Sequence, residues 1–179
     1  MILITGATGN IGTELTKILS ASRTPAHAFV HNRLPSGEIA LPSIEIAEGD
    51  FSKTETFAPA LAGVDCLFLL IPSSSKVEEQ QRNFVDEAKR SKVKRIVKLS
   101  QLVADENAAG RFQRYHAPVE KHILKSGIPY TFCGRTCSCR AYSTSVKRFR
   151  LRARFMRLPE TQLRVWLMCA ILRPSPPGF

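Results

Sequence analysis

The sequence has no long hydrophobic run, and this absence limits the kind of protein it can encode. No apolar stretch approaches the roughly 20 residues that a membrane-spanning helix needs. The first apolar segment starts at Met1, so we expect no signal peptide before it. We therefore expect a soluble cytoplasmic protein with no membrane partner. At 179 residues the chain can form one hydrophobic core but is short for a two-lobed enzyme.

Acidic residues are nearly missing from the last quarter of the chain. Residues 133–179 hold 10 Lys and Arg against one acid, Glu160, whereas residues 1–132 hold 16 against 14. The net charge of +11 is therefore concentrated at one end of the sequence, so it does not favour a nucleic-acid-binding protein as a whole. The arginine-rich run 148–157, which includes Phe149 and Phe155, leaves nucleic-acid binding open for that segment alone. Two compositions meet near residue 133.

The cysteines of this last segment lack the spacing of a metal site. Cys137 and Cys139 are separated by one residue, Cys133 lies four before Cys137, and no histidine follows His122. A zinc knuckle needs two to four residues between paired cysteines. We therefore expect no metal.

What is present is a glycine pattern at the start of the chain. Four apolar residues, 1–4, run without alternation into Gly6-x-x-Gly9-x-x-Gly12, and helical spacing follows. An unbroken apolar run is typical of a strand buried on both faces of a parallel sheet. The glycines then let the backbone turn sharply and approach a pyrophosphate at the helix N-terminus. This order of strand, glycines and helix predicts a dinucleotide site; a tight turn without ligand is the alternative.

Strand-like and helix-like segments continue to alternate up to residue 132. Strands are expected at 26–30, 44–47, 64–71, 95–100 and from 130, with helices at 54–61, 77–88 and 115–124. Such alternation predicts an α/β fold, a Rossmann-type doubly wound parallel sheet. From Cys133 the alternation stops, and only 158–172 keeps helical spacing. We therefore expect an incomplete C-terminal part, with a NAD(P)-binding domain at 1–132 and an aberrant basic tail at 133–179 that is not a native domain.

No acid follows the second strand, where a site that prefers NAD carries one for the ribose hydroxyls. Instead Arg33 lies 21 positions after Gly12, and no Asp or Glu occurs between His31 and Gly37. An arginine there can bind a 2′-phosphate through its planar fork. The sequence thus favours NADP(H) over NAD(H), although Arg33 has an ordinary surface role as its alternative.

Several short stretches resemble one family. Residues 5–12 (TGATGNIG), 48–51 (EGDF), 97–100 (VKLS) and 126–131 (SGIPYT) are similar to those of the NmrA-like group of atypical short-chain dehydrogenases/reductases, and within it to NAD(P)H:quinone reductases and azoreductases. The resemblance covers about residues 1–132. It implies a small-molecule electron acceptor, a quinone or an azo compound, and leaves the oligomeric state open.

The pattern and the resemblance together give the expected site residues. The cofactor-binding set is Gly6, Thr8, Gly9, Asn10, Ile11, Gly12, Arg33, Asp50, Phe51 and Ile71. The resemblance places Asp50 and Phe51 beside the adenine; a helix N-cap is the alternative for Asp50.

The catalytic residues are less clear, because the Tyr-x-x-x-Lys pair of the wider superfamily is missing. Tyr115 is followed by Val119 at the fourth position, and Lys121 lies on another helical face. Ser100 ends a strand where the superfamily keeps its serine. His116 and Glu120 share a face, and the resemblance directs them toward the nicotinamide; a surface contact between them is the alternative.

The break at Cys133 has a specific explanation. In a frame displaced by one base, the codons of residues 133–136 can encode Leu-Arg-Pro-Asn, with which the family continues. We therefore expect a frameshift, which would make this chain a weakly active or inactive form of an NADPH-dependent reductase. A genuine basic extension is the alternative for the tail. A dinucleotide-binding redox sensor without turnover is the alternative for the function.

Overall fold

The structure is a computed structural model, and it describes residues 1–31, 39–101 and 104–135. Its centre is a six-stranded parallel sheet in the order β3-β2-β1-β4-β5-β6. The strands are β1 (Ile2–Ile4), β2 (Ala26–Val30), β3 (Ile44–Glu48), β4 (Cys66–Leu69), β5 (Arg95–Gln101) and β6 (Tyr130–Arg135). The order reverses between β1 and β4, which is where a doubly wound sheet binds its ligand. The predicted α/β fold is therefore confirmed.

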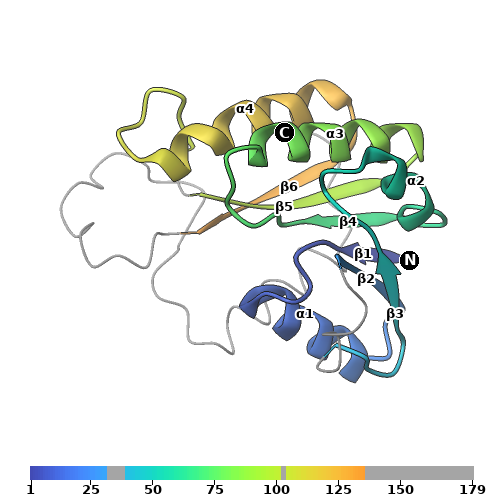
Figure 1. The fold of residues 1–179 in the computed structure, drawn as a ribbon. Coiled ribbons are helices and arrows are strands. Elements are labelled where there is room, and N and C mark those ends of the chain that lie inside the picture. The colour runs from blue at the N-terminus through green and yellow to red at the C-terminus, as the bar shows by residue number, and fades with distance from the viewer. Residues whose placement is uncertain (32–38, 102–103, 136–179) are drawn as a thin grey trace.

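Helices cover both faces of this sheet (Figure 1). On one face lie α2 (Phe57–Ala60), α3 (Val77–Arg90) and α4 (Arg111–Ser126), while α1 (Asn10–Ala21) covers the other. A short 3₁₀ helix, η2 (Thr54–Thr56), precedes α2. All residues of β1 and β4 are buried, as their unbroken apolar runs predict.

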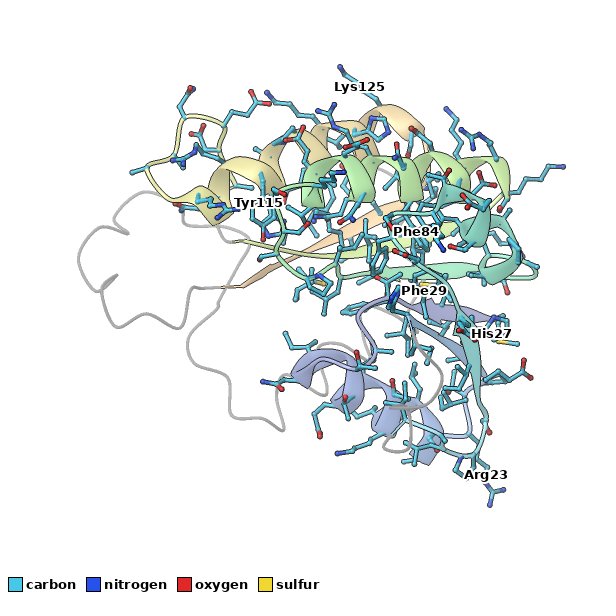
Figure 2. The ribbon with its side chains drawn as sticks, in the orientation of Figure 1. Arg23, His27, Phe29, Phe84, Tyr115 and Lys125 are labelled. Atoms are coloured by element: carbon cyan, nitrogen blue, oxygen red, sulfur yellow. The ribbon has the colours of Figure 1, made fainter. Side chains whose placement is uncertain are left out.

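The two faces of the sheet have separate apolar cores, because successive side chains of a strand point to opposite sides. Leu3 and Phe29 pack with α2, α3 and α4, whereas Ile2, Ile4 and Val30 pack with α1. Phe29 and Phe84, labelled in Figure 2, meet edge to face with ring centroids 5.4 Å apart. This pair of aromatic rings packs β2 against α3.

The structure changes some predicted bounds. The helix predicted at 54–61 is divided into η2 and α2, and the strand predicted at 64–71 is shorter, at Cys66–Leu69. The sixth strand continues past the predicted boundary at 132 to Arg135, because residues 133–135 pair with Leu99–Gln101 of β5. Gly127 caps the C-terminus of α4 with φ of +77°, and Gly63, in the turn after α2, has φ of +71°, a conformation that glycine adopts without strain.

Several predictions concern residues outside the described part of the chain. They are the phosphate-binding role of Arg33, the helix at 158–172, the arginine-rich run and the tail cysteines beyond Cys133. Within the described residues, none of the helices combines the length and apolar character required to span a bilayer.

Candidate functional site

The glycine turn joins β1 to α1, and each glycine has a different reason to lack a side chain. At Gly6 φ is +64°, and a Cβ would lie 2.7 Å from the carbonyl oxygen of Leu70. At Gly12 a Cβ would collide with the Gly6 carbonyl and lie 2.6 Å from the Cα of Ala7. These two glycines are therefore needed by the protein itself. At Gly9 the nearest atom, the Gly6 oxygen, would be 3.4 Å from a Cβ, so its missing side chain leaves space outside the fold.

The N-terminus of α1 is open toward that space. Gly9 is the N-cap residue and offers no side chain to cap the helix, and the first turn of α1 contains no acidic residue. By contrast, the first turn of α3 carries Glu78 and Glu79. Thr8, Gly9 and Asn10 are exposed. Among the described residues, the first N–H groups of α1 and its positive dipole end therefore have no capping side chain and no acid beside them, the arrangement that binds phosphate.

Thr5 holds this turn against β4, at the point where the strand order reverses. Its hydroxyl accepts a hydrogen bond from the Leu70 N–H at 2.7 Å and lies 3.0 Å from the carbonyl oxygens of Phe68 and Leu70. Thr5 is fully buried. The carboxyl ends of β1 and β4 are thus fixed side by side, which positions the glycine turn for a ligand.

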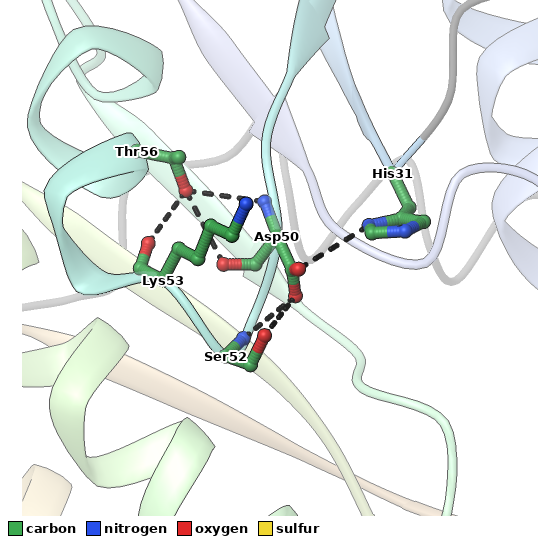
Figure 3. Close-up of polar contacts among 5 residues, drawn as sticks. All are labelled: His31, Asp50, Ser52, Lys53 and Thr56. Atoms are coloured by element: carbon green, nitrogen blue, oxygen red, sulfur yellow. Dashed lines mark hydrogen bonds and ion pairs between the residues drawn. The ribbon is translucent and has the colours of Figure 1, made fainter.

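Asp50 lies beyond the carboxyl end of β3, next to the end of β2 (Figure 3). Its Oδ1 accepts hydrogen bonds from the N–H and hydroxyl of Ser52 at 2.8 and 2.7 Å, and its Oδ2 lies 3.7 Å from Nδ1 of His31. The Ser52 N–H, with its hydroxyl, lowers the pKa of Asp50, so the carboxylate is charged at neutral pH. Asp50 is thus fixed by its own turn, and the residue before η2 is Lys53; the N-cap alternative for Asp50 is wrong.

Phe51 and Ile71, two further predicted cofactor residues, contact the core. The Phe51 ring packs on Phe29 and Phe84 with centroid distances of 5.0 and 5.9 Å, and it remains half-buried. Ile71 is 7% exposed and belongs to the same apolar cluster, just after β4. Both residues adjoin the carboxyl ends of strands, where they can border a ligand as well as the core.

The predicted catalytic residues meet around a lysine that sequence reasoning missed. Lys98 of β5 is fully buried, and its Nζ lies 2.6 Å from Oε1 of Gln81, on α3, and 3.0 Å from Nδ1 of His116, on α4. The signal was present in the sequence: Lys98 follows Ile96 at the two-residue period of a strand, so it occupies an inward position of β5.

Burial determines the electrostatics of this cluster. It lowers the pKa of Lys98 to about 7, against a raising effect of the Glu120 carboxylate. Burial, with the charge of Lys98, lowers the pKa of His116 to about 3, so its imidazole is neutral at physiological pH. The pKa of Glu120 is raised by burial. Perturbed groups gathered in this way are typical of functional sites.

Ser100 and Glu120 form the second contact of the cluster. The Ser100 hydroxyl donates a short hydrogen bond to Oε1 of Glu120. His116 is 8% exposed and Glu120 is half-buried, and the two bind different partners. The alternative of a surface contact between His116 and Glu120 is therefore wrong, and the structure places Ser100, His116 and Glu120 together.

Tyr115 and Lys121 do not form the pair that the superfamily uses. The Tyr115 hydroxyl lies 3.2 Å from the Ser73 hydroxyl, whereas Lys121 binds Glu106 at 2.7 Å. Ser73 follows β4 at the carboxyl side of the sheet, so its contact places the first turns of α4 at that side. Figure 2 shows Tyr115 near the end where β5 and β6 finish. In the part of the chain that the structure describes, no three His, Cys, Asp or Glu side chains are placed to hold a metal ion.

Comparison with known proteins gives the same assignment for this part of the chain. The sequence profile of a family described as NAD(P)H-binding matches residues 6–132. The chain is 27% identical over 132 residues to the NAD(P)H azoreductase of Xenophilus azovorans, covering 74% of this chain and 46% of that protein. It is 36% identical over 138 residues to quinone oxidoreductase 2 of Escherichia coli, covering 73% and 46%.

A solved structure shows the same fold. The triphenylmethane reductase of Citrobacter sp., crystallised with NADP(H), superposes with a TM-score of 0.67 at 29% identity, over 73% of this chain and 47% of that one. The chain spans about half the length of the curated relatives it matches. The predicted resemblance to quinone reductases and azoreductases is confirmed for the matched residues.

Proposed function

Because the chain belongs to the NAD(P)H-binding family, we propose that it binds NADPH and derives from a reductase of small, electron-poor acceptors such as quinones and azo compounds. The observation that carries the proposal is the turn at Gly9, where the backbone is exposed, the helix has no side-chain cap and a Cβ would meet only the Gly6 oxygen, at 3.4 Å. The residues fit the cofactor, because the missing side chain of Gly9 lets a pyrophosphate come as close to the backbone as it requires.

The cofactor would lie across the carboxyl edge of the sheet. Thr8 and Asn10 would hold the pyrophosphate with their backbone, and Gly9, whose N–H donates to the Gly6 oxygen, would allow its close approach. Ile11 and Gly12 would continue that contact into α1, and Asp50 with Phe51 would border the adenosine. Arg33 supports NADPH over NADH on sequence grounds, because it can pair with a 2′-phosphate. The relatives named for reduction of a quinone and an azo compound support the acceptor class.

When bound, NADPH supplies a hydride from C4 of its nicotinamide, which together with one proton from water reduces a quinone to a hydroquinone. The protein's task is then to hold donor and acceptor in contact and to stabilise charge on the acceptor oxygen. A quinone needs little acid catalysis, which suits a site whose Tyr115 and Lys121 are bound elsewhere.

The proposal extends to the tail. Because the matched residues end at 132 and the composition changes there, we propose that turnover by this chain is weak or absent, while the local turn at Gly9 still binds NADPH. The later loops of a doubly wound sheet form its acceptor side, so a changed sequence there affects turnover before cofactor binding.

Purified chain titrated with NADPH, followed by NADPH oxidation with and without the quinone menadione, tests the function. We expect saturable NADPH binding and a slow oxidation that depends on menadione. In the full-length parent protein, binding without any acceptor-dependent oxidation would favour the non-catalytic redox sensor. No binding of either nucleotide would refute the proposal.

A further inference from the structure

Among the described residues, the buried amine of Lys98 has three hydrogen-bond partners, and each can accept a hydrogen bond. They are Oε1 of Gln81 at 2.6 Å, Nδ1 of His116 at 3.0 Å and the carbonyl oxygen of Leu99 at 3.4 Å. A protonated lysine has three N–H donors and no acceptor. The number of donors therefore matches the number of acceptors, so the ammonium is fully paired although Lys98 is buried.

This match determines where the imidazole proton of His116 lies. An amide oxygen and a carbonyl oxygen accept only, but Nδ1 accepts only when it carries no hydrogen. Beside an ammonium, Nδ1 must be unprotonated, and the proton of the neutral ring is then on Nε2. The tautomer of His116 is thus fixed by Lys98.

We infer that Lys98 is a positioning residue that, in its protonated form, holds His116 in the Nε2–H tautomer. His116 then presents a hydrogen-bond donor at the carboxyl edge of the sheet, where the electron acceptor would bind. The role of His116 toward the electron acceptor rests on the proposed reductase function. The coupling between Lys98 and His116 does not depend on that function.

The topology places His116 at that end. The helix α4 follows β5 and returns toward the start of β6, so its first turns lie over the carboxyl ends of the strands (Figure 1). Tyr115, the preceding residue, contacts Ser73 beyond β4. A donor there can stabilise the negative charge that develops on a quinone oxygen when it receives a hydride, before that oxygen takes a proton from water.

Loss of the Lys98 proton reverses the arrangement. A neutral amine has two N–H groups and one lone pair. The oxygens of Gln81 and Leu99 retain the two N–H groups, so the lone pair faces Nδ1 and the imidazole proton moves from Nε2 to Nδ1. His116 then no longer offers its Nε2–H as a hydrogen-bond donor at the carboxyl edge of the sheet.

The pKa of Lys98, lowered to about 7 by burial, places this change near neutral pH. The neighbouring titratable groups on the packed elements are His116 and Glu120 of α4 and Cys133 of β6. Gln81, the contact from α3, carries no charge. Since burial and Lys98 lower the pKa of His116 to about 3, and burial raises that of Cys133 to about 12, neither residue changes its charge between pH 6 and 9.

Imidazole nitrogen NMR of the full chain tests the coupling without any turnover. We expect the His116 ring to change from the Nε2–H to the Nδ1–H tautomer between about pH 6 and 9, with its midpoint near the pKa of Lys98. In Lys98→Met the change with pH should disappear. Lys94→Met is the matched control, because Lys94 is exposed and binds Asp65 just before β5. A His116 tautomer that is the same in wild type and Lys98→Met at every pH would overturn the inference.

A second measurement tests the role at the acceptor. With NADP⁺ bound, titration with menadione should shift the Nε2–H signal of His116 at pH 6, and His116→Gln, which keeps both an acceptor and a donor, should bind menadione at least about tenfold tighter than His116→Leu. Equal menadione affinity of the two variants would overturn the role. The Lys98-dependent tautomer without any menadione binding, both in this chain and in the chain with its reading frame corrected, would instead refute the proposed acceptor.

Discussion

At the scale of single residues, the three glycines of the turn have separable roles. Gly12 is surrounded by the protein's own backbone, whereas Gly9 is exposed and its φ of −83° and ψ of 166° suit any residue. A substitution at each glycine should therefore distinguish a demand of the fold from a demand of the ligand.

We predict that Gly9→Val leaves the fold intact but weakens NADPH binding at least tenfold, because the side chain would occupy the position of the pyrophosphate. Gly12→Ala should instead destabilise the protein by roughly 1–3 kcal/mol through overpacking. Thermal unfolding and nucleotide titration of both variants provide the check. Unchanged NADPH affinity in a folded Gly9→Val protein would remove the main support for the site.

The choice of cofactor is also a property of one residue. We predict that Arg33→Glu weakens NADPH binding and spares NADH, because the change replaces a partner of the 2′-phosphate with a like charge. Titrations with the two nucleotides give the comparison, with Arg23→Glu, at an exposed turn after α1, as the control. Equal loss for both nucleotides would show that Arg33 does not contact the phosphate.

At the scale of elements, β5 is unusual because it carries a charged side chain into the contact with α3 and α4. Burial of an ammonium is costly unless it is paired, and the hydrogen bonds to Gln81 and His116 offset only part of that cost. The lowered pKa of Lys98 is the direct consequence, and it links stability to pH.

The sign of that link follows from the proton count. The pKa of Lys98 falls from 10.5 to about 7 on folding, so between these values the unfolded chain binds more protons and stability rises with pH. We predict that the contribution of Lys98 to the free energy of unfolding rises by roughly 2–3 kcal/mol between pH 7 and 9. Urea unfolding of wild type and Lys98→Met at both values measures it. The comparison with the variant cancels the opposing effect of Cys66, whose thiol has a raised pKa and does not interact with Lys98. The prediction would be contradicted if the free energy of unfolding of wild type, relative to that of Lys98→Met, does not increase between pH 7 and pH 9.

At the scale of the whole molecule, the question is the origin of residues 133–179. The family profile ends at residue 132, and the charge and cysteine content change at the same place. The strand β6 extends into the segment as far as Arg135, since strand pairing depends mainly on backbone hydrogen bonds and tolerates many side chains.

We predict that the gene contains one inserted or deleted base near codon 133, whose correction restores Leu-Arg-Pro-Asn and a reductase continuation. The corrected chain should oxidise NADPH with menadione at least tenfold faster than the present chain, because it regains the loops of the acceptor side. Sequencing of the gene from independent isolates tests the frameshift, and the NADPH oxidation rates of the present and corrected chains test the effect on activity. The same tail in frame in every isolate, with active protein, would contradict both parts.

The sequence by itself determined the fold and the cofactor turn, because these depend on local patterns. The unbroken runs of β1 and β4 indicated a buried parallel sheet, and the spacing of Gly6, Gly9 and Gly12 indicated the dinucleotide site. Each signal lies within a few residues, and backbone geometry converts it directly into structure.

Only the tertiary structure decided how the catalytic candidates are arranged. Lys98 contacts Gln81 and His116, 17 and 18 positions away, and Tyr115 contacts Ser73 across 42 positions. Such contacts depend on how α3 and α4 are set on the sheet, which no local period specifies. A lysine within an apolar strand showed that β5 was unusual, but only packing showed that its amine meets an imidazole and loses its water there.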